Sequence, residues 1–94
     1  MNFLEAVAQL FPDGVIVRDA TRTHVEVHDL ARNAVPRNCE IVASGQFQYD
    51  HDQGCRNSYL IRIEKFVLLV RTLPIAGSHR KLYAEVTLRS TQPG

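Results

Sequence analysis

The sequence predicts an α+β fold, in which an N-terminal helix packs on a strongly bent, five-stranded antiparallel sheet or a small open barrel. An amphipathic segment at the start predicts the helix, and five later segments have strand-like patterns. The longest of these, residues 58–72 (SYLIRIEKFVLLVRT), would span about 50 Å at roughly 3.3 Å per residue. A strand of that length has to bend and serve two parts of a sheet, which favours a bent sheet or open barrel.

Length and composition place the chain among ordinary globular domains. Its 94 residues are 45% hydrophobic, which suffices for one compact core. We therefore expect a single domain over residues 1–94, with residues 90–94 as a mobile tail. The longest apolar run, residues 66–70, is far shorter than the roughly 18 residues of a membrane span. The start also lacks the basic segment of a signal peptide, so we expect a cytoplasmic protein.

The first helix is predicted over residues 3–11. Asn2 and Glu5 have the spacing of a capping box. The apolar side chains that follow recur with the helical period, at Phe3, Val7, Leu10 and Phe11. Residues 12–14, Pro-Asp-Gly, then end the helix and turn the chain.

A first β-hairpin is predicted from residues 14–19 and 23–29. Its two strands can be paired so that four valines share one face, namely Val15, Val17, Val25 and Val27. A single helical turn is expected at residues 30–32, capped by Asp29.

The third and the last strands are predicted over residues 39–49 and 81–89. The apolar face of the third strand would consist of Cys39, Ile41, Ala43, Phe47 and Tyr49. Opposing Phe47 to Tyr59 aligns this face with that of the long strand. The last strand would pair with the second half of the long strand and leave a free edge for a partner.

The cysteines and histidines offer weak metal-binding patterns. Cys39 and Cys55 form no C-x-x-C motif, and a cytoplasmic setting predicts reduced thiols. His24 and His28 would lie about 13 Å apart on one strand, too far to share a zinc ion. A site that combines one of them with His51 and Cys55 remains an alternative.

No catalytic motif accompanies these residues. Residues 50–54, DHDQG, begin like a calcium loop, but the glycine comes one position early and Ile61 stands where the loop needs glutamate. Cys55 and His51 are the best nucleophile and base pair, yet the chain has no G-x-S-x-G elbow and no phosphate-binding loop. We therefore predict no enzymatic activity, cofactor or metal.

Weak binding of single-stranded nucleic acid is one of two functions that the sequence leaves open. The net charge of +1 argues against a strong electrostatic commitment to nucleic acid. The outer face of the last two strands would nevertheless combine cations with one aromatic ring. This set consists of Arg62, Lys65, Lys81, Tyr83 and Arg89.

Protein–protein interaction is the function that we favour, either with another protein or within a homodimer. Leu73 and Ile75 put apolar side chains into a connection where polar residues are usual, and the last strand is expected to be a free edge. The alternative for Leu73 and Ile75 is that they fold over the end of the barrel.

One family resemblance bears on this function. The opening MNFLEA, together with Leu10, Gly14, Val17 and Arg18, resembles the start of a phage anti-defence family that sequesters nucleotide signals in the Thoeris system. It covers less than a fifth of the chain, and the tryptophans of that family are absent. The resemblance implies that the protein could act as a small inhibitor or regulator from a phage or mobile element.

Overall fold

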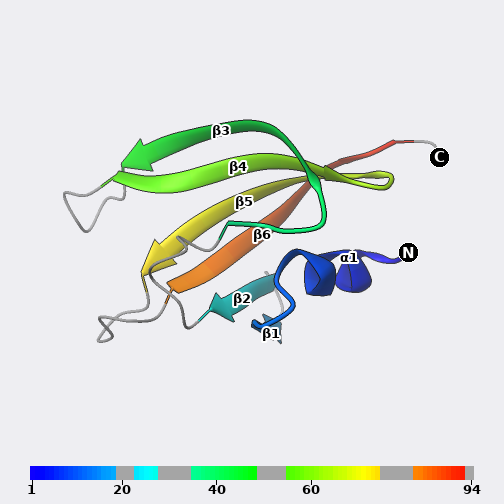
Figure 1. Ribbon diagram of the computed structural model, residues 1–94, viewed down its shortest axis with the longest axis horizontal. Helices are drawn as coiled ribbons and strands as arrows, with labels where there is room; N and C mark the ends of the chain where they lie inside the picture. Colours follow the sequence, from blue (N-terminus) through cyan, green and yellow to red (C-terminus); the bar gives the residue numbers. More distant parts are fainter. Residues whose placement is uncertain (19–22, 28–34, 49–54, 75–81, 93–94) are drawn as a thin grey trace.

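The computed structural model describes residues 1–18, 23–27, 35–48, 55–74 and 82–92, which form one helix and a six-stranded antiparallel sheet (Figure 1). The elements are α1 (Phe3–Leu10), β1 (Val15–Arg18), β2 (Thr23–Val27), β3 (Glu40–Gln48), β4 (Cys55–Ile63), β5 (Phe66–Pro74) and β6 (Leu82–Thr91). The strand order is β1-β2-β6-β5-β4-β3, so the sheet is open. The α+β class is therefore confirmed, with six strands in place of the five predicted.

Helix α1 begins with the capping box that the sequence predicts. The backbone N–H of Glu5 donates to Oδ1 of Asn2 at 2.9 Å, and the N–H of Asn2 donates back to Oε1 of Glu5 at 3.3 Å. One face of the helix is buried, through Ala6, Val7 and Leu10. None of the described helices is long and apolar enough to cross a membrane.

Removal of this cap should measurably weaken the fold. Asn2→Ala leaves helix N–H groups without an acceptor, and we expect the free energy of unfolding to fall by about 1 kcal/mol in urea denaturation. Asn2→Ser keeps an oxygen at the same place and should restore most of the loss. An alanine variant as stable as the wild type would show that the cap contributes nothing.

The predicted single strand over residues 58–72 is wrong, because the chain folds there into the hairpin of β4 and β5. Ile63 pairs with Phe66, so Glu64 and Lys65 form a two-residue turn. Glu64 adopts a left-handed φ of 49°, which a two-residue hairpin turn requires and which glycine or asparagine usually supplies. This turn divides the one predicted strand into two, so the sheet has six strands and not five.

A bulge changes the predicted pairing of β3. The register shifts between Ile41 and Ala43, which leaves Val42 as the extra residue, and Phe47 pairs with Arg56. The predicted pair of Phe47 with Tyr59 is therefore wrong. Beyond the bulge the faces exchange: Ile41 pairs with core-facing Ile61, whereas Ala43 pairs with Leu60 on the other face.

The first hairpin forms with a register one residue away from the prediction. Ile16 pairs with Val25, and Val15 with Glu26. Ile16 therefore packs against the core beside buried Val25, while Val15 is 56% exposed. The helical turn predicted at residues 30–32 lies outside the described residues.

Strand β6 is central and not a free edge, which corrects the prediction for the last strand. It pairs with β2 on one side and with β5 on the other. The predicted pairing of the last strand with residues in the second half of the long strand is confirmed, because β6 pairs with β5. Strand β6 ends at Thr91, two residues beyond the predicted end at Arg89. The sheet edges are β1 and β3.

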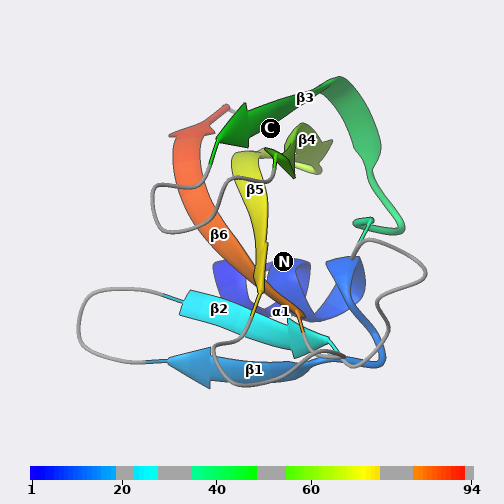
Figure 2. The same cartoon turned by 90° about the vertical axis from the view of Figure 1, so that its left-hand side faces the viewer.

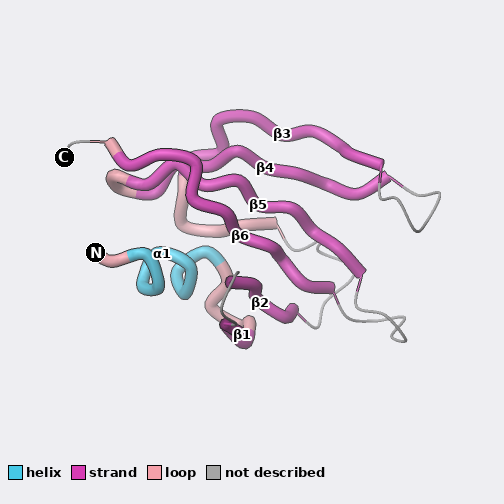
Figure 3. Tube along the Cα trace, turned by 180° about the vertical axis from the view of Figure 1, so that it is seen from behind, coloured by secondary structure: helices cyan, strands magenta, loops and turns pink. Residues whose placement is uncertain are grey.

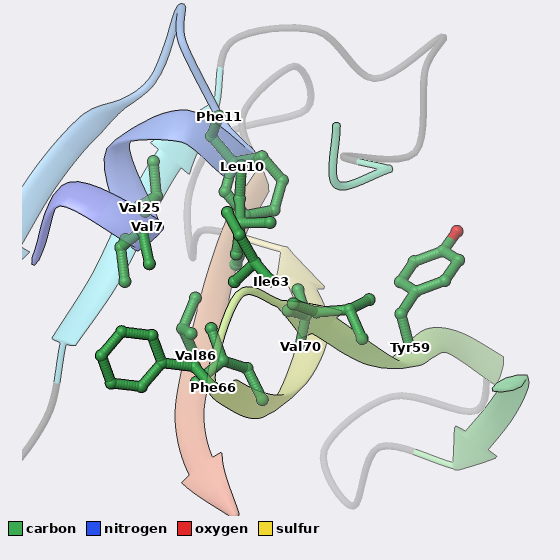
Figure 4. Packing of buried hydrophobic residues seen from close by; sticks show 13 residues of the cluster. Val7, Leu10, Phe11, Val25, Tyr59, Ile63, Phe66, Val70 and Val86 are labelled. Carbon is green, nitrogen blue, oxygen red and sulfur yellow. The ribbon is translucent and has the colours of Figure 1, made fainter. Parts of the chain in front are cut away.

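The hydrophobic core lies between α1 and one face of the sheet (Figure 4). Figure 2 shows how the strand direction turns across the sheet between β1–β2 and β5–β6.

The C-terminal end of α1 is covered by residues 35–39. The backbone N–H of Arg37 donates to the carbonyl oxygen of Leu10 at 2.9 Å, and Nδ2 of Asn38 donates to the carbonyl oxygen of Gln9 at 2.9 Å. Figures 1 and 3 show that β3 forms the edge of the sheet that lies farther from α1.

Candidate functional site

The outer edge of β3 is the strongest candidate for a binding surface in the described part of the chain. Among the described strands, β3 is hydrogen-bonded to β4 alone. Its nine residues are all exposed except Phe47, which is half-buried. A long, exposed edge strand presents a row of backbone N–H and C=O groups that another strand can bind.

The composition of β3 does little to prevent such pairing. Natural edge strands are usually short or carry lysine, proline or a bulge. From Ile41 to Gln48 the strand has no charged residue and no proline, and Ile41 and Val42 are 44% and 52% exposed. The bulge at Val42 protects one end only, whereas β1, at the other edge, is four residues long and ends at Arg18.

Phe47 is held in place on the face of β3 that points away from the core. The guanidinium carbon of Arg71 lies 4.0 Å from the centre of the Phe47 ring, a cation–π contact. Nη1 of Arg71 also lies 3.9 Å from Oε1 of Glu85, its cross-strand partner on β6. Because the Arg71 guanidinium lies against one face of the ring and fixes its position, Phe47 can act as a preformed anchor for a partner.

Two further residues on this face, both beyond the bulge, are small. Ala43 and Gly45 alternate with Phe47 and pair with Leu60 and Ser58 of β4. A Cβ added at Gly45 would meet only Oγ of Ser58, at an ordinary 3.7 Å. The edge thus combines one fixed aromatic ring with two positions where a partner's side chain can approach the backbone closely.

The residues predicted for nucleic-acid binding do not form one cluster. Arg62 and Arg89 lie toward the end of the sheet that carries the β4–β5 turn, and Nζ of Lys65, in that turn, is 5.4 Å from the Phe66 ring. Tyr83 pairs with residue 73, six residues along β5 from residue 67, which corresponds to about 20 Å. Lys81 lies outside the described residues.

The prediction of exposed apolar surface is corrected for Leu73. Leu73, which pairs with Tyr83 of β6, is only 4% exposed, and it therefore offers a partner no surface. Ile75 lies outside the described residues. The low exposure of Leu73 agrees with the alternative prediction that this side chain is buried at the end of the sheet or barrel.

Titratable groups do not build a chemical site in the described part of the chain. Burial raises the pKa of the Cys39 thiol, which is free and packs against the core. Burial likewise raises the pKa of the Tyr59 hydroxyl, which points away from the core cluster in Figure 4. No three His, Cys, Asp or Glu side chains gather as metal ligands among the described residues, and the side chains of His51 and Cys55 lie outside them.

No protein-family model, no curated protein and no solved structure matches this chain. What the β3 edge can do therefore has to be argued from its own residues. The predicted pairing of residues 39–49 with the long strand turned their apolar face inward. For that reason Ala43, Gly45 and Phe47 were not predicted as an exposed group. The signal that could have found them is the uncharged run at residues 41–48.

Proposed function

We propose that this protein is a small, non-enzymatic binding module that acts through protein–protein interaction at the outer edge of β3. The observation that carries the proposal is the exposed, nine-residue edge strand with no charge from Ile41 to Gln48. An incoming strand would extend the sheet through backbone hydrogen bonds, and side chains on alternate positions would provide specificity.

The side chains of β3 suit this role on both sides of the bulge. Phe47, fixed by Arg71, supplies an aromatic anchor at one end, and aromatic residues are enriched where binding energy concentrates. Ile41 and Val42 supply exposed apolar area at the other end. A module of this kind can regulate or inhibit a partner simply by occupying its strand, as a small phage or mobile-element inhibitor would.

The edge can be tested by placing a charge in its middle. We expect Gly45→Lys to abolish the capture of partners from a native lysate, because a charged side chain at the edge disfavours strand addition. Thr87→Lys is the matched control: it puts the same charge on an exposed strand residue of β6, which is central. A specific partner should be retained by the wild type and by Thr87→Lys and lost with Gly45→Lys. Equal capture by all three proteins would show that β3 is not the binding surface.

Weak binding of single-stranded nucleic acid is the second candidate. It is favoured by Arg62, Lys65 and Arg89, which lie toward one end of the sheet. Glu40, the cross-strand neighbour of Arg62, and Glu64, in the same turn as Lys65, offset part of that charge.

Salt dependence tests this second candidate. Three phosphate contacts predict that the binding constant for an oligonucleotide falls with salt at a logarithmic slope of about −2. The triple variant in which Arg62, Lys65 and Arg89 become serine should then lose binding. Absent or salt-insensitive binding by the wild type would remove this candidate.

A further inference from the structure

We propose that the strand that binds the β3 edge is β3 of a second copy of this chain, paired antiparallel about a two-fold axis at Gly45. The inference rests on the proposed function and names the partner of the same edge. It would join two six-stranded sheets into one continuous sheet across the two-fold axis.

The faces of β3 restrict the register of such a pair. A two-fold axis perpendicular to the sheet keeps each face on its own side, so a residue must oppose one that points to the same face. Beyond the bulge at Val42 the alternation is regular. Ala43, Gly45 and Phe47 point to the face of Leu60, whereas Ser44 and Gln46 point to the face of Tyr59.

The register centred on Gly45 satisfies this condition along the regular segment. Ala43 then opposes Phe47 of the second copy, and Ser44 opposes Gln46 of the second copy. Apolar residues meet apolar residues, polar residues meet polar residues, and the smallest side chain lies opposite each aromatic ring. Centring on Ser44 would instead oppose Ile41 to Phe47, which the bulge places on opposite faces.

Charge also permits self-pairing. Like charges directly opposite each other on paired strands are destabilising. Residues 41–48 contain no charged residue, so no register within this segment opposes two like charges. The paired segment is short, and such small interfaces are weak, so we expect a reversible, concentration-dependent dimer.

Charge reversal at the two-fold axis provides the test. Sedimentation velocity should show a dimer fraction that rises with concentration for the wild type and for Thr87→Lys. Gly45→Lys and Gly45→Glu should each be monomeric, because each puts two like charges opposite each other. An equimolar mixture of Gly45→Lys and Gly45→Glu should restore dimers, as heterodimers. A Cβ at Gly45 would make only an ordinary contact with Oγ of Ser58, at 3.7 Å, and the residue is exposed. We therefore expect the monomer to keep its fold in both variants, which circular dichroism would verify.

A second pair of variants tests the same register without changing Gly45. The double variant Ser44→Lys with Gln46→Glu places opposite charges across both symmetric pairs and should dimerise at least as strongly as the wild type. Ser44→Lys with Gln46→Lys should be monomeric. Both substitutions are at exposed positions, so the monomer fold should be retained in each.

Three outcomes would overturn the inference. These are a wild type that stays monomeric up to about 1 mM, single Gly45 variants that dimerise as well as the wild type, and a mixture that restores nothing. The proposed function is judged separately by the lysate experiment. A monomeric wild type that still loses a partner upon Gly45→Lys would mean that the edge binds another protein and not a second copy.

Discussion

Replacing Leu68 by alanine is expected to lower the free energy of unfolding by about 2–5 kcal/mol. Leu68 is fully buried on β5, where it pairs with Ile61 of β4 and with Leu88 of β6. Strands on both sides hold the backbone, so the surrounding side chains can only partly fill the cavity. Urea denaturation followed by circular dichroism measures the loss.

Leu88→Ala is the matched control for this substitution. It deletes the same atoms from the residue directly opposite Leu68, but Leu88 is 47% exposed. We expect it to cost less than about 1 kcal/mol, because the side chain loses less burial and leaves no closed cavity. Equal losses for the two variants would contradict the placement of the core on this face of β5.

Gly14→Ala should destabilise the fold by about 1–3 kcal/mol, although it adds a single methyl group. A Cβ at this position would overlap Cγ1 of Val25, which is fully buried, and would lie 3.3 Å from both the carbonyl oxygen of Glu26 and Cβ of Phe11. Val25 cannot move away easily, because a β-branched side chain has few rotamers. The cost should appear as a lower urea midpoint with an unchanged slope.

Gly45→Ala controls for the general effect of adding a methyl group to a glycine. Its Cβ would find only Oγ of Ser58 at 3.7 Å, so the free energy of unfolding should stay constant or rise slightly. If Gly14→Ala were as harmless as Gly45→Ala, the close packing of residue 14 against β2 would be wrong.

The sequence predicted the α+β class and most elements, and it failed where single residues redirect the chain. The turn at Glu64 and Lys65 was missed because neither residue is a usual former of two-residue turns, although Glu64 adopts a left-handed conformation there. A signal was present: the apolar pattern changes from alternating to continuous at these two residues. A turn between two strands explains that change better than one bent strand does.

The bulge at Val42 prevented the candidate site from being predicted from the sequence. One extra residue, Val42, reverses the faces of β3, so alternation alone placed Ala43 and Phe47 toward the core. The position of β6 between β2 and β5 depends on contacts distant in sequence, which local patterns do not encode. Because β6 lies inside the sheet, the last strand cannot be the free edge that the sequence predicted. The candidate binding surface is instead the edge strand β3.

Amide hydrogen exchange of β3 is the most direct test of the claim that this edge binds a protein strand. In the dilute monomer, the outward-pointing amides between Ala43 and Phe47 should exchange rapidly, because no described strand covers them. In the associated state, formed at high concentration or with a captured partner, these amides should become protected while those of β1 stay unchanged. Association that protects other strands and leaves the exchange of β3 unaltered would contradict the account.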